Sequence, residues 1–434
     1  MFKLLRRSVA LLLMAVLLVP MIAACGSTGT GESNTNSASA NTNAASTNTN
    51  TATTNSNSAA TNSNATMNAN MNSNENMNVN MNSNANSSAN ANSNASSGST
   101  AAFTPRDVTA QLTGSGASFP DPVYQRWIQD YQSVAPNVTI NYQSVGSGQG
   151  RKDFFGNVTD FGASDKFASD KELSDYGQPV LHIPVVLGAV VATYNLEGVN
   201  DLQFSPETLV GIFMGTITNW NDPKIAADNP NAKLPDQPIT VVHRSDGSGT
   251  TSIWTNYLSS VSSEWKDKVG AGDTVQWPVG QGGEKNPGVA ALVKQTPGAI
   301  GYVELTYALG NNLPASAVKN AAGQFVKPSV ESVSAAAEGF MAQIPDDLRV
   351  NIVNPPEGEN AYPISGFTWL LVRKEMQDEN KAKALTDFIY WALTQGSDTA
   401  TQLFYAPLPE QVRTKAIDKL TQVTVNGQPV FQQP

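Results

Sequence analysis

Cysteine and histidine are almost absent from this chain of 434 residues, which has one cysteine and two histidines. A lone cysteine excludes an intramolecular disulfide. The histidines, His182 and His243, lack the paired spacing with acidic residues that indicates a metal cluster, so we expect no metal site and no cofactor. A hydrolase would need such a cluster or an activated nucleophile, and the sequence therefore argues against an enzyme.

Positive charge is also scarce. The chain has 26 lysines and arginines against 36 acidic residues, a formal net charge of −10. Nucleic-acid-binding domains carry basic patches, so this balance argues against a nucleic-acid partner. An anionic ligand would have to be held by local donors and not by a general positive field.

Large apolar residues and charges are rare from Gly26 to Ala102, where Asn, Ser, Thr and Ala dominate. Such a composition cannot bury a core. We therefore predict that residues 25–102 form a disordered polar tether.

The N-terminus has three basic residues among its first seven and then an apolar run from Val9 to Ile22. This run is too short for a comfortable membrane span, and it predicts a signal peptide over residues 1–24. The segment Ile22-Ala23-Ala24-Cys25 resembles a bacterial lipobox, which implies an acyl chain such as palmitate on Cys25 and attachment to the outer face of the membrane. The alternative is a plain signal peptide that happens to contain a cysteine.

The remaining body of about 330 residues, from Phe103 to Pro434, is long enough for two domains. Short apolar runs alternate there with helical patterns, which favours an α/β architecture. The predicted strands include 183–193 and 367–372, and the predicted helices 122–133, 206–213, 329–343 and 381–393. The proline-rich segment Asp222–Pro238 is predicted to be a surface loop.

The run Arg244-Ser-Asp-Gly-Ser-Gly-Thr250 lies between an apolar strand pattern and a helical pattern. It therefore opens onto a helix N-terminus, where free backbone N–H groups and the helix dipole favour an anion. Glycines allow close approach, and Arg244 offers a planar pair of donors for two oxygens. Taken alone, the same run is more typical of a β-turn before an N-capped helix with a surface arginine.

Two further Gly/Ser loops precede helical patterns: Gly114–Pro120, and Gly146–Gly150 before Arg151–Phe155. Each alone is more typical of a structural turn. Three such loops together with Arg244 favour a shared anion site. None of them fits a Walker A loop or a dinucleotide-binding fingerprint.

With Asp160-Phe-Gly-Ala-Ser-Asp165 and Pro297-Gly-Ala-Ile-Gly-Tyr-Val-Glu304, these loops resemble the markers of the PstS family, the phosphate-binding proteins of bacterial ABC importers. The resemblance implies a monomeric, two-lobed α/β fold of the type II periplasmic-binding-protein kind, with a central cleft and hinge strands between the lobes. Lobe I would comprise residues 109–184 and 364–434, and lobe II residues 185–363.

The same resemblance implies a set of phosphate ligands: Ser118, Phe119, Ser147, Asp165, Arg244, Ser248, Gly249 and Thr250. Asp246 would pair with Arg244 and fix its orientation. Asp165 would accept the proton that phosphate still carries at neutral pH and that sulfate lacks, so it would reject sulfate. Without the resemblance, Asp165 is better explained as a turn or N-cap residue.

The implied function is a lipoprotein that binds inorganic phosphate outside the cytoplasm and delivers it to the permease and ATPase of an ABC transporter. A surface sensor or adhesin that binds phosphate without transport is an alternative that the long tether permits. A phosphatase is the third possibility, and the scarcity of metal ligands and nucleophiles argues against it.

Overall fold

An eight-stranded sheet runs through residues 103–434, the part of the chain that the computed structural model describes. The order of its strands is β2-β1-β3-β11-β4-β8-β6-β7. Their bounds are β1 Ala110–Gly116, β2 Val138–Ser144, β3 Phe161–Ser164, β4 Val180–Tyr194, β6 Thr240–Arg244, β7 Gln281–Gly283, β8 Ala299–Glu304 and β11 Ser365–Arg373. The predicted signal peptide, Cys25 and the tether lie outside the described residues.

The two halves of this sheet run in opposite directions. Strands β1, β2 and β3 are parallel to one another, and so are β6, β7 and β8. Strand β11 is antiparallel to β3 and β4, and β4 is antiparallel to β8. Because the two halves pair with successive parts of β4, the carboxyl ends of the first three strands face those of the other three. Sheets of α/β proteins bind ligands at such ends.

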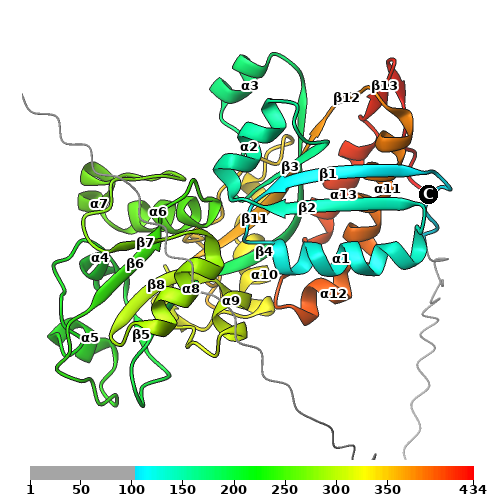
Figure 1. Ribbon diagram of the computed structural model, residues 1–434. Coiled ribbons are helices and arrows are strands. Elements are labelled where there is room, and N and C mark those ends of the chain that lie inside the picture. The colour runs from blue at the N-terminus through cyan, green and yellow to red at the C-terminus, as the bar shows by residue number, and fades with distance from the viewer. Residues whose placement is uncertain (1–102) are drawn as a thin grey trace, which may run out of the picture. The chain divides into compact units, whose positions relative to one another are not determined.

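Strand β4 belongs to both halves. Its residues up to Ala189 pair with β11, and Val190 to Tyr194 pair with β8. Figure 1 shows β4 and β11 between the cyan strands β1 and β2 on one side and the green to yellow strands β6 and β8 on the other. The α/β prediction is confirmed, whereas the division into lobes at fixed residues stays a prediction.

Helices cover both halves of the sheet. The longer ones are α1 Asp121–Val134, α2 Ser147–Phe155, α4 Pro206–Phe213, α6 Gly249–Val261, α8 Lys285–Gln295, α10 Val330–Glu338, α11 Glu379–Thr394 and α13 Glu410–Leu420. The shorter ones are α3 Asp170–Tyr176, α5 Pro223–Asp228, α7 Ser263–Lys268, α9 Leu305–Gly310, α12 Ser397–Gln402 and the 3-10 turn Met341–Gln343. The helices predicted at 122–133, 206–213, 329–343 and 381–393 are confirmed, the third as α10 and the 3-10 turn.

Three local predictions need correction. The segment Asp222–Pro238 is not wholly a loop, because Pro223 stands at the first position of α5 and the Asp222 side chain caps that helix. Residues 114–116 belong to β1 and not to a loop. Helix α2 begins at Ser147 and not at Arg151, so the predicted loop forms its first turn.

Two small three-stranded sheets flank the large one. One has the order β10-β9-β5 and the other β12-β13-β14. Their strands are β5 Gln203–Phe204, β9 Ala317–Lys319, β10 Phe325–Val326, β12 Glu375–Met376, β13 Thr424–Val425 and β14 Gln428–Pro429.

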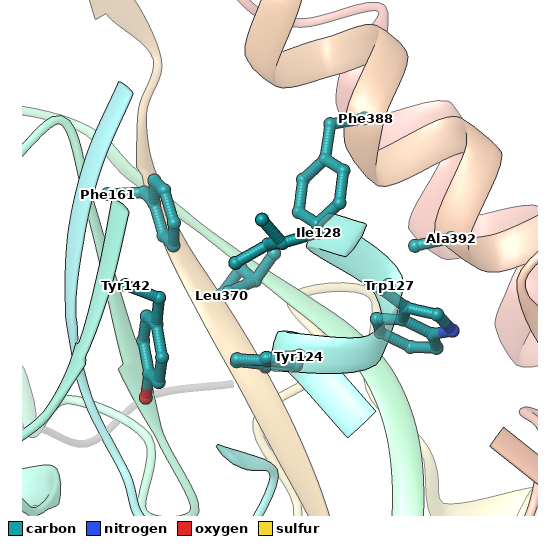
Figure 2. Close-up of a pocket in the computed structure, with 8 residues that line it drawn as sticks. All are labelled: Tyr124, Trp127, Ile128, Tyr142, Phe161, Leu370, Phe388 and Ala392. Atoms are coloured by element: carbon teal, nitrogen blue, oxygen red, sulfur yellow. The ribbon is translucent and has the colours of Figure 1, made fainter. Parts of the chain in front are cut away.

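Helix α1 packs on the sheet through an aromatic core. Figure 2 shows side chains of α1, α11 and the sheet converging on a small apolar cavity, whose lining includes Tyr124, Trp127, Tyr142 and Phe388. Its volume of about 10 Å³ leaves room for no more than one water molecule, so this is core packing and not a ligand site. The Tyr142 hydroxyl donates to the carbonyl of Ala117 at 2.6 Å, which ties this core to the start of α1.

The first described residues are fastened to α11. Arg106 forms an ion pair with buried Asp387, and its backbone N–H donates to the same carboxylate at 2.8 Å. The Arg106 guanidinium also donates to the carbonyls of Lys383 and Val430. The beginning and the end of the described chain therefore meet on one helix.

Among residues 103–434, no helix has both the length and the apolar character needed to cross a membrane.

Candidate functional site

Four helix N-termini meet where the two halves of the sheet face each other. Ser118 and Phe119 precede Pro120, the N-cap of α1. Ser147 is the first residue of α2, Gly249 is the first of α6, and Asn286 is the second of α8. All four helices have at least nine residues. Their free N–H groups and dipoles make this a region that favours negative charge.

The structure brings the predicted ligands together and buries them. Ser118, Phe119, Ser147, Asp165, Arg244, Ser248 and Thr250 are each no more than 3% exposed. Gly249 lies among them: a Cβ atom there would stand 2.6 Å from both the Ser147 hydroxyl and the Asp165 Cβ. Any side chain at this position would push the two halves apart.

Arg244 ends β6 and is held by its own loop. Its Nε donates to Asp246 Oδ1 at 2.8 Å and its Nη2 to Asp246 Oδ2 at 2.6 Å, the paired geometry predicted from the sequence. The backbone N–H of Lys285 adds a third donor to Asp246 at 3.0 Å. Burial raises the pKa of Asp246, but Arg244 and this N–H outweigh burial and hold the pKa below its usual range.

The remaining donor side of Arg244 points to the start of α6. Its Nη1 donates to the Thr250 hydroxyl at 3.2 Å. Ser248 caps the same helix, because its hydroxyl oxygen accepts from the Thr251 N–H at 3.0 Å. The Ser248 hydroxyl proton is not consumed by this bond, so it stays available to an anion.

Asp165 follows β3 and faces the α6 loop from the other half. The partners of its carboxyl are hydroxyls: Thr368 Oγ1 donates to Oδ1 at 2.8 Å, and Ser147 Oγ lies 3.4 Å from Oδ2. Burial raises the pKa of Asp165 to about 7, against the lowering effects of Thr368 and Arg244. The N-cap of the following helix α3 is Ser169, so the N-cap explanation for Asp165 is wrong.

Thr368 is a site residue that the sequence analysis missed. The pairing of β11 with β4 shifts register between Thr368 and Trp369, opposite Val186 and Pro184. Proline lacks the N–H that a regular ladder needs, and a register shift of this kind re-aims side chains. In the sequence, Pro184 in the apolar run 183–193 is the one indication of the shift. The residues around Thr368 do not indicate its contact with Asp165.

Asn286 is the second missed residue. Its side-chain Nδ2 donates to both the Ser118 and the Thr250 hydroxyls at 3.1 Å, and its backbone N–H donates to Ser118 at 3.2 Å. It thereby bridges loops from opposite halves of the sheet. The glycine pair 282–283 shortly before Pro287 was a usable signal for a helix start.

Other contacts cross between the halves around the site. The Gly148 N–H donates to the Gly247 carbonyl at 2.7 Å. Arg151, which is 5% exposed, pairs with Glu172 in its own half and with Asp273 in the other, and Lys166 also reaches Asp273 at 3.2 Å. The structure is therefore a closed arrangement in which both halves touch.

The chemistry of the site is that of an anion cradle with one acceptor. Hydroxyls, helix N–H groups and a guanidinium supply donors, and among residues 103–434 Asp165 adds a carboxyl that hydrogen-bonds to hydroxyls and not to an arginine. Such a set suits an oxyanion that brings a proton of its own.

Comparison with known proteins places the chain in a family. The PBP superfamily domain matches residues 94–395. The phosphate-binding protein PstS of Pasteurella multocida is 45% identical over 306 residues, which cover 70% of this chain and 88% of that protein. PstS of Methanocaldococcus jannaschii is 43% identical over 328 residues, covering 70% of this chain and 84% of the relative.

Solved structures share the fold. A phosphate-binding protein from Stenotrophomonas maltophilia aligns with a TM-score of 0.56 at 22% identity, over 71% of this chain and 93% of the other. PfluDING, a high-affinity periplasmic phosphate-binding protein solved with phosphate, aligns with a TM-score of 0.55 at 23% identity, over 70% and 92%. The predicted periplasmic-binding-protein fold and the prediction of a binding protein rather than an enzyme are confirmed. The chain belongs to the PstS family of phosphate-binding proteins.

Proposed function

We propose that this protein binds inorganic phosphate between the two halves of its sheet and delivers it to the permease and ATPase of an ABC importer. Family membership supports the general role. The observation that carries the assignment to this site is the pairing of one carboxyl, Asp165, with a cradle that otherwise consists of donors.

The proposed ligands are those inferred from the sequence. The hydroxyls of Ser118, Ser147, Ser248 and Thr250, the N–H groups of Phe119 and Gly249, and the guanidinium of Arg244 would donate, and Asp165 would accept. Phosphate at neutral pH satisfies both requirements, because it combines negative charge with a remaining proton. Sulfate would set an oxygen without a proton against Asp165, which costs several kcal/mol when the carboxyl is ionised.

Ligand capture would proceed by closure of two lobes, residues 109–184 with 364–434 and residues 185–363. The cross-half contacts of Asn286, Gly247 and Asp273 support a closed form that encloses the ligand. The continuous strand β4 supports a bending motion in which the sheet register is kept.

We also propose that Cys25 carries the lipid anchor and holds the protein at the extracytoplasmic face of the membrane. Mass spectrometry of the protein purified from its own membrane tests this directly. A mature N-terminus at Cys25 with added acyl mass is the expected result, and an unmodified Cys25 would exclude the anchor.

Calorimetric titration of the purified protein with phosphate, sulfate and arsenate tests the proposed ligand. We expect tight phosphate binding and, at pH 9, where Asp165 with its pKa of about 7 is ionised, sulfate binding weaker by about a hundredfold, the equivalent of nearly 3 kcal/mol. Equal binding of phosphate and sulfate would contradict the role given to Asp165.

A further inference from the structure

Glu304, the last residue of β8, is fully buried, and its carboxyl contacts uncharged groups. The Thr306 N–H donates to its Oε2 at 2.9 Å. The Tyr405 hydroxyl lies 3.0 Å from Oε2, and the Thr306 hydroxyl lies 3.4 Å from Oε1. Burying a carboxylate without a positive partner costs free energy, so the question is whether Glu304 is protonated.

Each of the two hydroxyls also reaches a backbone carbonyl, and the carbonyl is nearer. Tyr405 lies 2.7 Å from the Phe119 oxygen, and Thr306 lies 2.8 Å from the Leu403 oxygen. A carbonyl accepts only, and each hydroxyl has one proton. If both protons go to the carbonyls, an ionised Glu304 faces two hydroxyl lone pairs. A proton on Glu304 Oε2 removes the conflict at Tyr405, the nearer of the two hydroxyls, because the acid then donates to Tyr405.

The Phe119 carbonyl matters because it adjoins the Phe119 N–H, one of the proposed phosphate donors. Tyrosine hydroxyls hold the carbonyls on both sides of this residue: Tyr307 donates to the Ser118 oxygen at 2.6 Å, and Tyr405 reaches the Phe119 oxygen. Together these two bonds fix the backbone of Phe119 and with it the direction of its N–H. Reciprocal backbone bonds between Leu187 and Ala406, each 2.9 Å, hold the Tyr405 segment against β4.

We propose that Glu304 keeps a proton in the closed protein and donates it to Tyr405, so that Tyr405 donates to Phe119 and both act as positioning residues for the phosphate site. The inference rests on the proposed function where it concerns phosphate. The protonation of Glu304 itself does not depend on the ligand.

The electrostatic surroundings agree with a neutral Glu304. Burial, its largest influence, raises the pKa of Glu304 well above the ordinary value of 4.5, and nearby Asp165 raises it further. The other titratable groups around it are Tyr405 and, on α9, Tyr307, whose own pKa values burial also raises. A charged Glu304 would also place a second acidic charge beside Asp165 and so repel the anion.

The unfolding free energy of the wild type and of Glu304→Gln, measured without phosphate from pH 5 to pH 8, tests the proton. The folded acid keeps its proton where the unfolded acid has lost it, so the wild type loses stability as pH rises above about 4.5, and the variant lacks this contribution. The ratio of the two unfolding constants should shift in favour of Glu304→Gln by up to tenfold per pH unit. A ratio independent of pH would overturn the proposal.

Phosphate titration of Tyr405→Phe tests the positioning role, because this change removes the hydroxyl and keeps the ring. We expect phosphate affinity to fall by about tenfold, the value of one buried hydrogen bond. The matched control is Tyr257→Phe, since Tyr257 is equally buried and its hydroxyl has no partner within residues 103–434. An affinity of Tyr405→Phe equal to that of the control would overturn the role of Tyr405.

A pH series of phosphate titrations joins the two tests. At alkaline pH the wild type should lose affinity relative to Glu304→Gln, because an ionised Glu304 draws the Tyr405 proton away from Phe119. If neither the ratio of the two affinities nor the ratio of the two unfolding constants changes with pH, the proposed hydrogen bonds from Glu304 to Tyr405 and from Tyr405 to Phe119 are refuted. If the wild type binds no phosphate at all, the proposed function fails, whereas the unfolding series still decides the protonation of Glu304.

Discussion

Asp165 and Asp246 are aspartates on opposite sides of one site, yet their environments differ. Asp246 is held by Nε and Nη2 of Arg244 and by a backbone N–H, and these partners keep its pKa low. Asp165 has hydroxyl partners, and burial raises its pKa to about 7. The comparison shows that the surroundings, and not the residue type, decide whether the pKa of a carboxyl is lowered or raised.

Removal of Arg244 should have the largest effect, because it takes away the guanidinium and leaves Asp246 without its partner. We expect Arg244→Ala to weaken phosphate binding by about 2–5 kcal/mol in calorimetric titration. Arg126→Ala is the control, since Arg126 pairs with Asp130 on the exposed side of α1. A loss in Arg244→Ala no greater than in this control would place Arg244 outside the phosphate site.

Asp165→Asn should remove the titratable carboxyl of Asp165 and with it the rejection of sulfate. An amide can donate to sulfate, so sulfate binding should strengthen by about 1–3 kcal/mol, the usual cost of an unsatisfied buried group. Phosphate binding should change little. Competition titration with both anions measures the difference, and undiminished rejection of sulfate by the variant would remove Asp165 from the selectivity role.

A change of pH around neutrality should change the protonation of Asp165 but not that of Asp246. The pKa of Asp165 is raised to about 7, so the carboxyl is protonated below that pH and donates to sulfate. Wild-type sulfate affinity should therefore be highest below pH 7 and fall as pH rises through 7, by at most tenfold per unit. Asp165→Asn should show a flat profile, and a flat wild-type profile would argue that Asp165 is ionised throughout.

Asp246→Asn should have the smallest effect. The amide oxygen can still accept from Arg244 and from the Lys285 N–H, and the lost ion pair is partly exposed, with 17% of the Asp246 side chain accessible. We expect phosphate affinity to fall by about 1 kcal/mol or less. A loss as large as that of Arg244→Ala would mean that the orientation of the guanidinium depends entirely on Asp246.

Most of the site geometry that could be predicted from the sequence lies within short local motifs. The Arg244–Asp246 pair and the α6 N-terminus lie within seven consecutive residues, so their geometry follows from a strand, a glycine turn and a helix start. The same reasoning overlooked Asn286, because α8 joins the site only through the sheet order β8-β6-β7.

Residues that act across the chain could not be predicted for a physical reason. Thr368 reaches Asp165 across 203 positions of sequence, and Tyr405 reaches Phe119 across 286. Both contacts depend on the pairing of β4 with its neighbours, including a register shift at Pro184. Periodicity reports which side of a strand is buried, but it does not report which distant strand lies beside it.

The clasp between Arg106 and Asp387 has a mechanical consequence. It fastens the start of the described chain to α11, which contacts β1, whereas the contacts that close the site are made by Asn286, Gly247 and Asp273. A pulling force applied ahead of Phe103 would thus act on α11 and on the half of the sheet that contains β1, and not directly on β6, β7 and β8. Tension on the leading segment would therefore reach the β1 half without passing through the contacts that Asn286, Gly247 and Asp273 make across the site.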